Sequence, residues 1–135
     1  MRKILPLSIA VNGIISIISL TILFHALVIA GVIPINIVWG GNLTDKTQLY
    51  TMEAVSIALN GMMLFIILSY SGAVRPRINR KFIIGAIWFM FLLFLLNTVG
   101  NLLAKSSTET YIFTPVTFLL AVFCLRIAAF EYRKK

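Results

Sequence analysis

The sequence predicts an all-α integral membrane protein, built as one antiparallel bundle of four transmembrane helices. It also predicts an interfacial or re-entrant segment between the first two helices. The chain has 135 residues, of which 60% are hydrophobic and only 12% are charged. A soluble domain carries about twice that charged fraction. The apolar residues fall into four runs, each long enough to cross a bilayer, and we expect a single domain over residues 1–135.

The first span is expected over residues 4–33. Pro6 falls in its first turn, where a missing backbone N–H costs little, and Pro34 is expected to end the helix. A helix of this length would measure about 45 Å, which exceeds a hydrocarbon core of about 30 Å, so it would tilt or protrude. The basic N-terminus imitates a signal peptide. However, the apolar run is far longer than the hydrophobic part of one, so we interpret it as a helix that is retained.

The segment from Pro34 to Asp45 is too apolar for a solvated loop and too interrupted for a span. Trp39 suits the level of the lipid headgroups, and Gly40-Gly41 permits a sharp turn. Each large apolar side chain left in water would cost about 1.5–3 kcal/mol. We therefore expect this segment to fold back over the outer mouth of the bundle.

Three further spans are expected over residues 48–71, 82–105 and 111–130. In the second span, Glu53, Ser56 and Asn60 are spaced so that they share one helix face. In the third span, Asn97 and Asn101 are four residues apart and again share a face. The fourth span is the least polar.

The basic residues predict the orientation. Ten of the 12 Lys and Arg residues lie at the N-terminus, in the loop around residues 72–81 or from Arg126 onward, all on one side of a four-span protein. Three of the four acids lie on the other side. Because cationic loops stay in the cytoplasm, we expect both termini to be cytoplasmic, in a bacterial inner membrane. The net charge of +8 then reflects contact with lipid headgroups, and no nucleic-acid partner is expected.

Several classes of site are excluded by composition. The single cysteine, Cys124, lies inside an apolar run and is expected to pack there, so neither a disulfide nor a thiolate metal site is possible. The single histidine, His25, rules out a multi-histidine metal site. No motif indicates a reaction class or a particular cofactor.

The candidate ligand-binding residues are polar side chains in the outer half of the bundle. In hydrocarbon such side chains are costly and usually face a partner or a cavity. Simple hydrogen bonding between helices, worth about 0.6 kcal/mol per pair, explains each of them singly but not their shared depth. The predicted site consists of His25, Trp39, Glu53, Asn60, Asn97 and Asn101.

Three functions remain open at this point. In the first, an outward-facing polar pocket binds or transports a small solute, a lipid headgroup or a proton, with Glu53 and His25 as a coupled proton site. In the second, the chain is a non-catalytic accessory subunit whose polar residues face a larger membrane protein or a second copy. In the third, His25 and Glu53 form the acid–base pair of an intramembrane enzyme. The first requires one interior cavity, the second requires polar side chains facing outward, and the third requires both groups within reach of one ligand atom.

Overall fold

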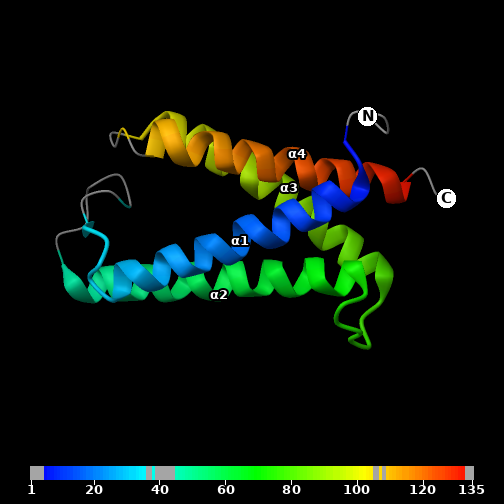
Figure 1. Ribbon diagram of the computed structural model, residues 1–135, viewed down its shortest axis with the longest axis horizontal. Helices are drawn as coiled ribbons and strands as arrows, with labels where there is room; N and C mark the ends of the chain where they lie inside the picture. The colour runs from blue at the N-terminus through cyan, green and yellow to red at the C-terminus, as the bar shows by residue number, and fades with distance from the viewer. Residues whose placement is uncertain (1–4, 36–37, 39–44, 105–106, 108, 133–135) are drawn as a thin grey trace.

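The computed structural model describes residues 5–35, 38, 45–104, 107 and 109–132 (Figure 1). Four long helices are present there, and all four are long and apolar enough to cross a membrane. A single π-helical turn, η3, directly precedes the last of them. The predicted antiparallel four-helix membrane bundle is therefore confirmed. The elements are α1 (Leu7–Ile29), α2 (Lys46–Ser71), α3 (Arg80–Leu102), η3 (Glu109–Phe113) and α4 (Thr114–Tyr132).

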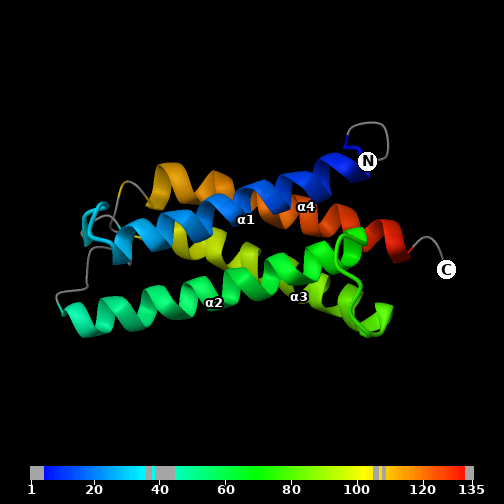
Figure 2. The ribbon, with the colours of Figure 1, turned by 60° about the horizontal axis from the view of Figure 1, so that its bottom comes forward.

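The bundle consists of two hairpins. α1 packs along α2 and α3 packs along α4, while α1 also lies against α4 and joins the hairpins (Figures 1 and 2). α2 and α3 pack on each other less extensively. We call the end that holds the start of α1, the connection 72–79 and the end of α4 the basic end. The opposite end, with the end of α1, the start of α2 and η3, is the acidic end.

The first helix is shorter than predicted, because Gly31 rather than Pro34 ends it. Gly31 has a φ of 75°, a conformation that glycine adopts readily. Its amide donates to the carbonyl of Val28 and the amide of Val32 donates to that of Leu27, each at 3.0 Å. These two hydrogen bonds form a Schellman motif, which closes a helix. With 23 residues, α1 is about 35 Å long, which is enough to cross a hydrocarbon core of about 30 Å.

The second and third helices each begin two residues earlier than predicted, because capping side chains precede them. The carboxylate of Asp45 accepts hydrogen bonds from the amides of Thr47 and Gln48 at 3.3 and 3.4 Å. The side chain of Asn79 accepts one from the amide of Lys81 at 2.9 Å. Such caps satisfy amides that have no partner within the helix.

The centre of the bundle is apolar and closely packed. Its fully buried side chains include Ile18, Ile67 and Ile87, and Cys124 is fully buried among them, as expected for a packing residue. A Cβ atom added to Gly13 would lie 2.4 Å from the ring of Phe123. The close approach of α1 to α4 therefore depends on this glycine.

The predicted interfacial segment is only partly described. Val38 is buried against Val28 and Leu49, and Ile35 packs on the same small cluster. The described part of the segment thus lies against the acidic end of the α1–α2 hairpin. Residues 36–37 and 39–44, with Trp39 among them, lie outside the described residues, so the complete fold-back remains a prediction.

Candidate functional site

A buried histidine–glutamate pair joins α1 to α2 near the acidic end. His25 Nδ1 lies 2.6 Å from Glu53 Oε2. The side chain of Glu53 is 0% exposed, whereas that of His25 is 16% exposed. His25 is about one turn from the end of α1 and Glu53 about two turns from the start of α2, so antiparallel packing brings them to the same level.

The surroundings of this pair are apolar on the α1 side. The ring of Phe24 meets the imidazole of His25 edge to face, with centroids 5.7 Å apart. Phe24 also meets Phe113 of η3 in the same way at 5.4 Å. A charge in such a place is stable only when it is paired or neutralised. The short His25–Glu53 contact provides such a pairing.

A second polar cluster joins α3 to α4 and is separate from the first. Thr117 Oγ1 lies 3.0 Å from Thr98 Oγ1 and accepts a hydrogen bond from Asn101 Nδ2 at 3.4 Å. The hydroxyl of Thr110 donates to the backbone carbonyl of Asn101 at 3.2 Å. Asn101 therefore bonds across the α3–α4 hairpin, which is the packing role that such residues usually have.

The structure brings two of the six predicted site residues into contact with each other. His25 and Glu53 are in contact, and Asn101 belongs to the α3–α4 cluster. The side-chain amide of Asn60 donates to the carbonyl of Ser56 on its own helix at 2.8 Å. Asn97 is exposed on the outside of the bundle, and Trp39 lies outside the described residues. The ligand-binding role of these residues remains a prediction.

Sequence reasoning missed a polar network at the basic end. Glu131 Oε1 lies 2.9 Å from Arg80 Nη2, and Glu131 Oε2 accepts from Arg80 Nε at 3.3 Å. The hydroxyl of Tyr70 donates to Glu131 Oε1 at 3.1 Å. One carboxylate thus connects α2, α3 and α4. One feature of the sequence could have indicated this network: Glu131 is the single acid among the segments that carry most of the basic residues.

A buried arginine links the same end to the start of the chain. Arg126 is 5% exposed, and its Nε donates to the backbone carbonyl of Leu5 at 2.8 Å. Its guanidinium also lies over the ring of Phe130, 5.6 Å from the centroid, where a cation is attracted by the ring face. The sequence analysis used this arginine only as a marker of orientation, although it lies within an apolar run.

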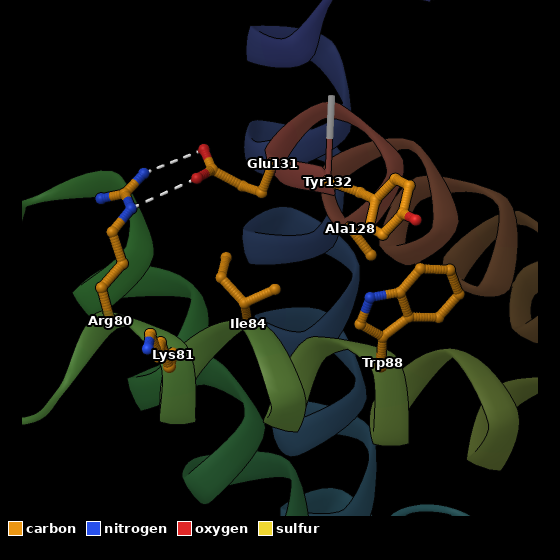
Figure 3. Close-up of a pocket in the computed structure, with 7 residues that line it drawn as sticks. All are labelled: Arg80, Lys81, Ile84, Trp88, Ala128, Glu131 and Tyr132. Carbon is orange, nitrogen blue, oxygen red and sulfur yellow. Dashed lines mark hydrogen bonds and ion pairs between the residues drawn. The ribbon is translucent and has the colours of Figure 1, made fainter. Parts of the chain in front are cut away.

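Two grooves flank the Arg80–Glu131 pair at the basic end. One, of about 460 Å³, is lined by α3 and α4 (Figure 3). The other, of about 440 Å³, is lined mainly by α1, the end of α2 and the end of α4. Among the described residues, no group of three His, Cys, Asp or Glu side chains is placed to hold a metal ion. The described cavities therefore lie at the end opposite to the one that the sequence analysis favoured.

Comparison of the chain with protein families, with curated proteins and with solved structures found no match.

Proposed function

We propose that this chain is a proton-binding membrane protein and that the His25–Glu53 pair is its proton site. The observation that carries the proposal is the 2.6 Å contact between an imidazole and a carboxylate that has no exposed surface. A carboxylate–imidazole pair exchanges a proton as one coupled unit. In an apolar interior, gaining or losing that proton changes the charge of the pair, which the surrounding helices must accommodate.

A proton suits this site better than a larger ligand does. Glu53 has no exposed side-chain surface, so a solute or a lipid headgroup does not reach its oxygens in this conformation. His25 is partly exposed and provides the route by which a proton reaches the carboxylate. The same burial argues against the enzyme hypothesis, because a substrate atom has no access to both groups at once.

The proposed orientation places this site toward the outside of the cell. The positive-inside bias puts the basic end in the cytoplasm of a bacterial cell and the acidic end at the external face. At the same end, Asp45 caps α2, and Lys46 and Tyr50 lie in the first turns of that helix; all three are exposed. Tyr111 of η3 is exposed as well. Among these titratable side chains, that of Glu53 has no exposed surface.

Infrared difference spectroscopy of the purified chain in lipid bilayers tests this proposal. A pH step across the range in which the bundle stays folded should exchange a carboxylate band for a protonated carboxyl band. Glu53→Gln should remove that exchange, because glutamine keeps the shape and hydrogen-bonding capacity of the side chain but carries no titrating group. Glu131→Gln is the matched control and should retain it. An unchanged band in Glu53→Gln, or no band that depends on Glu53, would contradict the proposal.

Asn97 favours a second candidate function, that of an accessory subunit in a larger membrane complex. Its side chain is exposed on α3, within the apolar part of the helix. A polar amide facing hydrocarbon is costly, whereas a partner helix would satisfy it. A photo-crosslinking residue at position 97 in native membranes should then form a protein adduct, whereas one at the exposed Phe89 of the same helix should label lipid. Lipid labelling at both positions would exclude this candidate.

A further inference from the structure

The larger groove at the basic end has a cationic side and an apolar floor. Arg80, Ile84 and Trp88 follow each other at intervals of four residues on α3, so they share one face of that helix. Ala128 and Tyr132 of α4 line the opposite wall. Figure 3 shows the basic side chains at one side of the groove and the rings of Trp88 and Tyr132 at the other.

The side chains that line this groove carry more positive than negative charge. Arg80 is paired with Glu131, whose carboxylate also lines the groove. Lys81 lines the same groove and is exposed, so it adds a positive charge that this ion pair does not neutralise. Arg75 and Arg77, both exposed, lie in the connection that leads into α3. The groove therefore complements an anionic group at its basic side.

The groove extends along α3 and is apolar over part of its length. From Arg80 to Trp88 the groove follows α3 for eight residues, which is about 12 Å along the helix. Ile84 and the small Ala128 leave an apolar surface between the two aromatic rings and the basic side chains. The ring of Trp88 packs edge to face against the ring of Phe91, and the two ring centroids are 6.0 Å apart. Tryptophan and tyrosine rings also favour the boundary between headgroups and acyl chains.

We propose that this groove binds an anionic phospholipid of the surrounding leaflet. The phosphate lies against Lys81 and the outer side of Arg80, and one acyl chain lies along Ile84 and Ala128 toward Trp88. Basic grooves between transmembrane helices on the cytoplasmic side bind acidic headgroups in this manner. The site lies at the end of the bundle opposite to the His25–Glu53 pair and does not depend on the proposed proton chemistry.

Fluorescence quenching by brominated lipids tests the proposal. The chain has two tryptophans, so Trp39→Phe leaves Trp88 as the sole reporter. In nanodiscs, brominated phosphatidylglycerol should quench Trp88 more strongly than brominated phosphatidylcholine at the same mole fraction. Lys81→Gln should reduce this preference about fivefold, the effect of one basic residue near an anionic surface. Arg77→Gln removes an exposed charge that does not line the groove, and it should leave the preference nearly unchanged.

Each of these measurements either supports or contradicts the proposed lipid site. Equal losses in Lys81→Gln and Arg77→Gln would show diffuse attraction to the basic end and would overturn the proposed site, as would equal quenching by the two lipids. Added inorganic phosphate should not displace the lipid, because the apolar floor contributes to binding only when an acyl chain is present. Displacement by phosphate at the same ionic strength as a chloride control would show a site for a free anion instead.

Discussion

At the basic end, the polar contacts of Glu131 and Arg126 reach three helices and the residue that leads into the fourth. At the acidic end, the His25–Glu53 contact and the hydrogen bonds of Thr117 each join two helices of one hairpin. Glu131 connects α4 to Tyr70 of α2 and Arg80 of α3, and Arg126 bonds to the carbonyl of Leu5 before α1. The contact between His25 and Glu53 joins α1 to α2. The hydrogen bonds of Thr117 with Thr98 and Asn101 join α3 to α4.

This difference indicates that the two ends of the bundle have different structural roles. The basic end connects the two hairpins through charged groups, of which Arg126 is buried. At the acidic end, the ring contact of Phe24 with Phe113 connects the two hairpins. A change in the charge of the His25–Glu53 pair would then alter the packing of one hairpin at its acidic end while the basic end keeps the bundle assembled.

The largest effect on stability is expected from removing the buried arginine at the basic end. Arg126→Met keeps a long side chain at this position but removes the charge and the hydrogen bond to the carbonyl of Leu5. A hydrogen bond from a charged donor contributes about 1.5–3 kcal/mol. We expect the free energy of unfolding to fall by that amount, measured by dodecyl sulfate titration in mixed micelles. Arg77→Met removes an exposed arginine of the connection and should have little effect. If the two variants lost the same free energy of unfolding, the buried arginine would have no special role in holding the basic end together.

A smaller effect is expected from the polar cluster at the acidic end. Thr117→Val keeps the shape of the side chain but removes the hydroxyl shared by Thr98 and Asn101, at a cost of about 0.6 kcal/mol for an average hydrogen bond between membrane helices. The same titration measures it, with Thr51→Val as the control, because Thr51 bonds only to its own helix at an exposed position. A loss as large as that of Arg126→Met would mean that both ends are equally coupled.

Much of the fold was predictable because each apolar run is long enough to cross a bilayer. The helix ends were less predictable, since single residues determine them: Gly31 ends α1 before Pro34, and Asp45 and Asn79 start α2 and α3 early. Apolar periodicity alone does not show these local hydrogen bonds.

The candidate site was predictable only in part. The meeting of His25 with Glu53 followed from their similar depth on consecutive antiparallel helices. Asn101 has a similar depth but lies elsewhere, because α3 packs along α4 rather than along the acidic half of the first hairpin. Depth along a helix can be estimated from the sequence, whereas the direction in which a helix faces depends on its neighbours. The network around Glu131 was missed because the orientation rule already explained the charges at that end.

If Glu53 and the imidazole of His25 share a proton, the nitrogen NMR signals of that imidazole depend on Glu53. His25 is the only histidine, so labelling histidine with ¹⁵N in the full chain gives the signals of one ring. In bilayers, we expect Glu53→Gln to shift the Nδ1 resonance strongly and the Nε2 resonance less, because Nδ1 is the atom that faces the carboxylate. Identical histidine spectra for the original chain and a folded Glu53→Gln variant would contradict it.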